Sequence, residues 1–123
     1  MAKTDVLIYQ DADGRVPLLD WLDGLPAKAR DKCIVRVELL AQMGHDLRRP
    51  HSDLLEQGIF ELRARLGSVN YRILYAFVGR HVVLLSHGCT KERAVPKTEI
   101  NRAVRNLGQF RKDPKAHTYA QGL

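Results

Sequence analysis

Three adjacent β-like runs between Glu61 and Lys91 constrain the fold most strongly, because their apolar patterns suit a packed sheet. The segment reads ELRARLGSVNYRILYAFVGRHVVLLSHGCTK. Residues 59–66 alternate apolar and charged side chains, which predicts a strand with one packed face and one wet face. Residues 70–78 and 81–89 are mostly apolar on both faces, and Gly79-Arg80 between them reads as a hairpin turn. The pattern therefore predicts a mostly antiparallel sheet in which residues 81–89 form a central strand.

The rest of the chain adds helices to this sheet. A short apolar run at residues 6–9 predicts a strand, and residues 44–58 read as a connector. Helical spacing of apolar residues predicts helices at 16–22 and 26–42, which form a helical hairpin, and a last helix opened by Pro96. Gly44 is the expected C-terminal cap of the second helix. The expected order is β-α-α-β-β-β-α, a small α+β domain with a twisted, mostly antiparallel sheet.

The length of 123 residues suits one domain with one core. We expect residues 1–112 to form this domain. Beyond Phe110 the chain becomes polar, so residues 113–123 are expected to be a mobile C-terminal tail. No repeat or low-complexity tract divides the chain.

The charge balance points to a phosphate-rich partner. Lys and Arg number 20 against 14 Asp and Glu, which gives a net charge of +6 and a pI near 9.6. A basic chain attracts RNA or DNA, although many basic proteins bind neither. The sequence has no secretory signal pattern or membrane-length apolar run, so a cytoplasmic protein with no membrane partner is expected. Its cysteines, Cys33 and Cys89, are expected to be reduced core residues.

Arginines gather on one face of the expected sheet. Arg63 and Arg65 are two residues apart and point the same way on a strand, and Arg72 follows on the next run. Lys91 and Arg93 come just after the third run and could join them. Two interpretations remain open: a phosphate-binding face, or a solvated face with cross-strand ion pairs. Glu61, which we expect on the wet face beside Arg63, is one of few nearby acids.

Aromatic and titratable residues near this face also allow two interpretations. Tyr71 and Tyr75 could stack on RNA bases, or could simply pack in the sheet. Ser86 and His87 are adjacent, so on a regular strand they point to opposite faces, with His87 beside Val83 and Leu85. His87 then reads more readily as a packed histidine than as a catalytic one. None of the five histidines has metal-ligand spacing, so no metal site is expected.

Several short motifs, in this order and spacing, resemble the RelE/HigB superfamily of type II toxins, in particular its phage-derived HigB-like branch. The motifs run from about Phe60 to Leu107, and they are Glu61-Leu62-Arg63, Asn70-Tyr71-Arg72-Ile73-Leu74-Tyr75, Leu84-Leu85-Ser86-His87-Gly88, Thr90-Lys91, Pro96-Lys97 and Glu99-Ile100-Asn101-Arg102-Ala103. The helical hairpin with Trp21-Leu22 is similar as well. In this pattern Glu92 stands where a second cation is usual, and Lys97 where some relatives have a tyrosine.

The resemblance implies a cytoplasmic endoribonuclease that cuts mRNA on the ribosome, is held inactive by a cognate antitoxin protein, and uses no metal or small-molecule cofactor. It implies catalytic roles for Arg63, Arg65, Arg72 and Lys91, with His87 as an alternative proton carrier. Since an arginine does not release its proton, the proton carrier must be another residue. Further RNA contacts are expected from Tyr71, Tyr75, Arg93 and Lys97.

Two other functions remain open at this point. One is a basic interaction module that inhibits a protein target without cleavage, as ParE-type toxins do. The other is an RNA-binding protein without catalysis. A nuclease needs a titratable group beside the arginines, whereas a binding protein needs only the arginines.

Overall fold

A five-stranded open sheet forms the centre of the molecule, in a computed structural model that describes residues 3–90 and 94–123. The strands lie in the order β1-β5-β4-β3-β2. Their bounds are Asp5–Ile8 for β1, Ser52–Glu56 for β2, Ile59–Leu66 for β3, Val69–Gly79 for β4 and Val82–Thr90 for β5. Only β1 and β5 pair in parallel. The expected α+β class with a mostly antiparallel sheet is confirmed.

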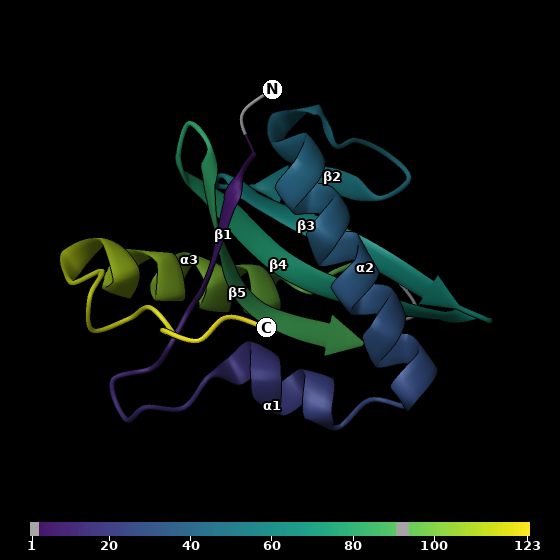
Figure 1. Cartoon of the computed structure of the whole chain (residues 1–123), viewed down its shortest axis with the longest axis horizontal. Helices are drawn as coiled ribbons and strands as arrows, with labels where there is room; N and C mark the ends of the chain where they lie inside the picture. The colour runs from purple at the N-terminus through teal and green to yellow at the C-terminus, as the bar shows by residue number, and fades with distance from the viewer. Residues whose placement is uncertain (1–2, 91–93) are drawn as a thin grey trace.

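Helices cover both faces of the sheet, as Figure 1 shows. Helices α1 (Pro17–Asp23) and α2 (Ala27–Met43) pack on one face, and α3 (Lys97–Lys112) packs on the other. Two apolar cores result, one under each helical layer. This arrangement explains why β4 and β5 are apolar on both faces. Within residues 3–90 and 94–123, no helix is both long enough and apolar enough to span a membrane.

The connector expected at residues 44–58 contains more structure than the sequence indicates. A short 3₁₀ helix at Gly44–Asp46 follows α2, and β2 then pairs with β3 as an edge strand. The order is therefore β-α-α-β-β-β-β-α, with one strand more than expected. Segment Ser52–Glu56 escapes recognition because an edge strand of five residues with three polar side chains lacks a strong alternating pattern.

A β-bulge in β5 changes which way its side chains point. Leu74 of β4 pairs with His87, and the next residue, Tyr75, pairs with Leu85, so Ser86 is the extra residue. His87 consequently lies on the α3 face with Leu74, whereas Leu85 belongs to the core under α1 and α2. The expectation that His87 shares a face with Val83 and Leu85 is wrong. So is the expectation that Ser86 and His87 point apart.

Gly44 and Gly88 each occupy a position that suits glycine. Gly44 has a φ of 52° and caps α2, as expected from the sequence. Gly88 lies within β5 directly against Trp21 of α1, where any added Cβ would overlap the indole ring. Glycine at position 88 therefore allows α1 to pack closely on β5.

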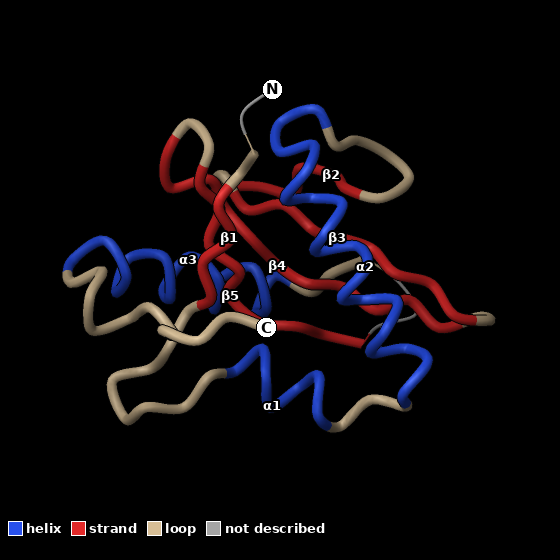
Figure 2. The backbone as a smooth tube through the Cα atoms, viewed as in Figure 1, coloured by secondary structure: helices blue, strands red, loops and turns tan. Residues whose placement is uncertain are grey.

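The C-terminal segment expected to be mobile is packed against β1. The Tyr119 N–H donates to the Ile8 carbonyl at 2.8 Å, and Thr118 forms an isolated bridge with Tyr9. His117 is buried, and its Nδ1 donates to the Gln10 carbonyl at 2.8 Å. Figure 2 shows the segment as a loop running beside β1. These contacts give the polar sequence a defined position.

Candidate functional site

Two of the predicted arginines meet around one buried carboxylate on the α3 face of the sheet. Arg63 of β3 and Arg72 of β4 are direct cross-strand partners. Both approach Glu61: the Arg63 Nε donates to its Oε1, and the Arg72 Nε lies 3.4 Å from the same oxygen. Glu61 is only 2% exposed and Arg72 only 7%. The wet face expected for Glu61 is wrong, and the cross-strand ion pairs considered from the sequence are present.

A second carboxylate extends this cluster to the edge of the sheet. Asp53 of β2 lies 3.4 Å from the Nη2 of Arg63 and 2.8 Å from the Nη2 of Arg49. The hydrogen bond from Arg49, together with the positive charges of both arginines, lowers the pKa of Asp53 below its usual value. We call Glu61, Arg63, Arg72 and Asp53 the arginine cluster. Its ion pairs hold the guanidinium groups in fixed positions.

Arg65 lies apart from the cluster carboxylates, beside a cationic hollow. The side chain of Arg65 is exposed, and its Nε donates to the Gly67 carbonyl at 3.0 Å. A hollow of about 260 Å³ lies next to it, lined by Arg36, Pro50, His51, Arg63, Arg65 and Asn70. Arg63 therefore belongs both to the arginine cluster and to the wall of this hollow.

His87 lies close to α3 and is 1% exposed. Asn106 of α3 donates to the Ser86 Oγ at 3.0 Å, and that hydroxyl lies 2.8 Å from the His87 Nδ1. The other ring nitrogen of His87, Nε2, lies 3.7 Å from the Glu99 carboxylate. Burial, and then the charge of Arg102, lowers the pKa of His87 to about 4. The imidazole is neutral at pH 7.

The remaining basic site residues separate into two groups. Lys91 and Arg93 lie outside the described residues; Lys91 directly follows Thr90, the last residue of β5. Lys97, at the start of α3, is exposed and forms an ion pair with Glu56 of β2. The ion pair holds Lys97 at the surface, next to the end of β2.

Both tyrosines expected to stack on RNA bases lie on the opposite face of the sheet. Tyr71 is 7% exposed and packs beside Trp21 of α1, with ring centroids 6.3 Å apart. Tyr75 is 1% exposed, and its hydroxyl lies 2.5 Å from the Ser52 Oγ. Neither ring has a free face for a base. The packing interpretation of both residues matches their surroundings.

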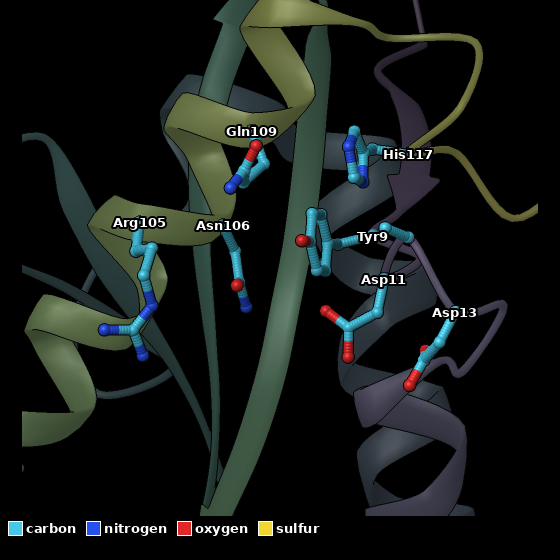
Figure 3. A pocket seen from close by; sticks show the side chains of 8 residues that line it. Tyr9, Asp11, Asp13, Arg105, Asn106, Gln109 and His117 are labelled. Atoms are coloured by element: carbon cyan, nitrogen blue, oxygen red, sulfur yellow. The ribbon is translucent and has the colours of Figure 1, made fainter.

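A second hollow, of about 390 Å³, lies between α3 and the end of β1. Figure 3 shows Tyr9 and Asp11 facing Arg105, Asn106 and Gln109 of α3 across it, with His117 stacked on Tyr9. Burial, and then the charge and hydrogen bond of Asp11, raises the pKa of Tyr9 to about 12. Because Asp11 and Asp13 line this hollow, it suits a phosphate less well than the cationic hollow does.

Several residues of the site have no clear signal in the sequence. Asp53, Arg49 and His51 lie in the expected connector, and Arg36 lies on a helix distant in sequence from the strands. Only Glu61 carries a usable signal, because it precedes Arg63 by two residues and so shares its face. Its burial depends on α3 and could not be foreseen.

Comparison with known proteins places the chain in one family. Residues 20–108, from within α1 to within α3, match the model of the family described as phage derived protein Gp49-like (DUF891). Comparison with curated proteins finds no significant match. The matched segment contains β2 to β5 and therefore the whole arginine cluster. The chain belongs to the phage-derived Gp49-like family, which is a toxin-like family.

Proposed function

We propose that this protein is the toxin of a type II toxin–antitoxin system and that it cuts ribosome-bound mRNA without a metal ion. The observation that carries the proposal is the convergence of Arg63 and Arg72 on Glu61 in a member of a toxin-like family. The resemblance to RelE/HigB toxins supports the same activity. Fixed guanidinium groups suit a reaction whose transition state gains negative charge at phosphorus.

The proposed reaction uses the RNA as its own nucleophile. The 2′-oxygen loses its proton to a base and bonds to the adjacent phosphorus, and the bond from phosphorus to the 5′-oxygen breaks. The departing 5′-oxygen takes a proton from an acid. The products are a 2′,3′-cyclic phosphate and a 5′-hydroxyl end. The protein must align the attack, stabilise the phosphorane and move two protons.

The arginines take different roles in this proposal. The Arg63 side chain is 34% exposed, so it can contact the phosphate directly. Arg72 has a side chain only 9% exposed, and it acts as a positioning residue through Glu61. Arg65, which is exposed, adds positive charge beside the reacting group.

Lys91 is our candidate for proton transfer. In the sequence it comes two residues after Cys89 of β5, which pairs with Arg72. Nearby arginine charges would lower the pKa of a lysine and bring it nearer to neutral pH. His87 is a weaker candidate, because it is buried and hydrogen-bonded through Ser86.

We further propose a cognate antitoxin protein as the inhibitory partner and the cytoplasm as the site of action. A second function, RNA binding without cleavage, is favoured by the burial of His87 and by the ion pairs that engage Glu61 and Asp53, the two carboxylates beside Arg63.

Single-turnover cleavage of ribosome-bound mRNA, measured with a metal chelator present, tests the proposal. Wild type should cleave, and Lys91→Arg should bind RNA but lose most of the cleavage because arginine keeps its proton. His87→Gln should cleave at a reduced but measurable rate. Normal cleavage by Lys91→Arg with none by His87→Gln would reverse the two roles. Tight RNA binding without cleavage by wild type would favour the second function.

A further inference from the structure

A pocket of concentrated positive charge opens beside the arginine cluster, where β2 stops covering β3. The pairing of β2 with β3 ends at Ser52 opposite Leu62, and the Arg63 N–H then donates to the His51 carbonyl at 2.8 Å. Past this point the outer edge of β3 is flanked by side chains of α2. The cationic hollow of about 260 Å³ lies here. Its volume equals that of about nine water molecules at ~30 Å³ each, which is enough for a phosphate group.

Helix α2 supplies cations to this edge through contacts with the backbone of β3. The Arg36 Nε donates to the Arg63 carbonyl at 3.2 Å, and the Lys32 Nζ donates to the Arg65 carbonyl at 2.7 Å. The bond from Arg36 uses one of its five N–H donors, so its terminal nitrogens can still bind an anion. The helix thereby adds positive charge to a site otherwise made from strands.

The lining of the hollow contains no carboxylate. Arg36, Arg63, Arg65 and His51 are joined there by Pro50 and Asn70. Within residues 3–90 and 94–123, neither Arg36 nor Arg65 has an ion-pair partner. Arg63 alone is paired, with Glu61 and Asp53. The positive charges of Arg36 and Arg65, which no described carboxylate pairs with, repel each other, and a bound anion relieves this repulsion.

We propose that the cationic hollow binds a backbone phosphate of single-stranded RNA, next to the phosphate held at the arginine cluster. This proposal rests on the proposed function for the identity of the polymer. Arg63 lines the hollow and also belongs to the cluster, so a polymer with regularly repeated phosphates can contact both places. Asn70 offers an amide donor and acceptor that suit a ribose 2′-hydroxyl. Arg36 is then an RNA-positioning residue.

The salt dependence of RNA binding tests this assignment. The probe is a short, fluorescently labelled single-stranded RNA, and its fluorescence anisotropy is measured at several salt concentrations. Arg36→Ala and Arg65→Gln should each weaken binding about fivefold at low salt. Each variant should also make the slope of the logarithm of the binding constant against the logarithm of the salt concentration shallower by about 0.7. This is the value expected for the loss of one phosphate contact to a single strand. Arg111→Ala, at the exposed end of α3, is the matched control and should change neither quantity.

Different results separate this proposal from the proposed function. If wild type binds RNA with these slopes but never cleaves it, the nuclease proposal fails and the hollow remains an RNA site. If wild type cleaves RNA and both variants keep the wild-type affinity and slope, the hollow proposal is overturned. Failure of wild type to bind RNA would overturn both.

A glutamate-rich peptide provides the competing probe. If Arg36→Ala and Arg65→Gln weaken binding of this peptide and leave RNA binding unchanged, the hollow is a protein-docking site and the RNA assignment is wrong. Thermal unfolding checks that Arg36→Ala is folded. Arg65→Gln alters an exposed side chain, and so it keeps the test valid if Arg36→Ala is unstable.

Discussion

Glu61 determines how the candidate site is organised at the scale of single residues. A buried carboxylate is stable only when cations and hydrogen bonds compensate the loss of water. Arg63 and Arg72 provide this compensation from two strands. Glu61 consequently orients both guanidinium groups, and its negative charge partly neutralises their positive charges. Binding strength at the site must then come from Arg63, Arg65 and Arg36, which keep exposed surface.

Arg72→Ala should lower the free energy of unfolding by about 3 kcal/mol, because it removes one partner of a buried charge. This differs from what the sequence predicts, an exposed arginine whose loss costs no more than about 1 kcal/mol. Urea denaturation of the purified variant measures the effect. Arg65→Ala, an exposed control, should stay within about 0.5 kcal/mol of wild type. Equal stability of the two variants would contradict the burial of the Glu61–Arg72 pair.

Sequence alone predicts part of this site. The alternation in β3 predicts that Arg63 and Arg65 share one face, with Arg72 on the next strand, and the structure adds that Arg72 lies directly opposite Arg63. Arg36 could not be predicted, because its approach to β3 depends on how α2 packs. The roles proposed for these residues stay predictions.

The contact between α3 and the bulge of β5 governs His87 at the scale of secondary-structure elements. The bulge turns Ser86 and His87 toward α3, where Asn106, Glu99 and Arg102 face them. Bulges depend on pairing geometry and leave little trace in a single sequence, so strict alternation along β5 predicts the wrong face for the side chain of His87. The sequence does not predict the edge strand β2 for a related reason, since its short polar segment acquires strand structure only beside β3.

The docking of α3 should therefore depend on pH through His87. The pKa of His87 is about 6.5 in the unfolded chain and about 4 in the folded protein, so the unfolded chain binds the proton more tightly. The buried neutral His87 therefore contributes fully to the free energy of unfolding above pH 6.5. This contribution is lost as the pH falls toward 4, and the total loss is about 3 kcal/mol. His87→Gln lacks this titration. The difference in unfolding free energy between wild type and the variant should shrink between pH 7 and pH 4. A constant difference over that interval would contradict a buried, neutral imidazole.

At the scale of the whole molecule, two-sided coverage of the sheet limits where a substrate can bind. Helices α1 and α2 cover one face and α3 covers part of the other, so the cationic residues gather near the β2–β3 edge. The sequence predicts the fold class because the apolar periods of the inner strands and helices are strong. It does not predict this edge, which depends on where β2 ends and α2 begins to flank β3.

Mapping mRNA 5′ ends after induced expression tests the central claim most directly. Wild type should create new internal 5′-hydroxyl ends within translated regions, and co-expression of the proposed cognate antitoxin should suppress them. Arg63→Ala, produced at the same level and checked for folding, should create few or none of these ends. The account would be contradicted if induced wild type leaves mRNA ends unchanged, or if folded Arg63→Ala produces the same ends at the same frequency.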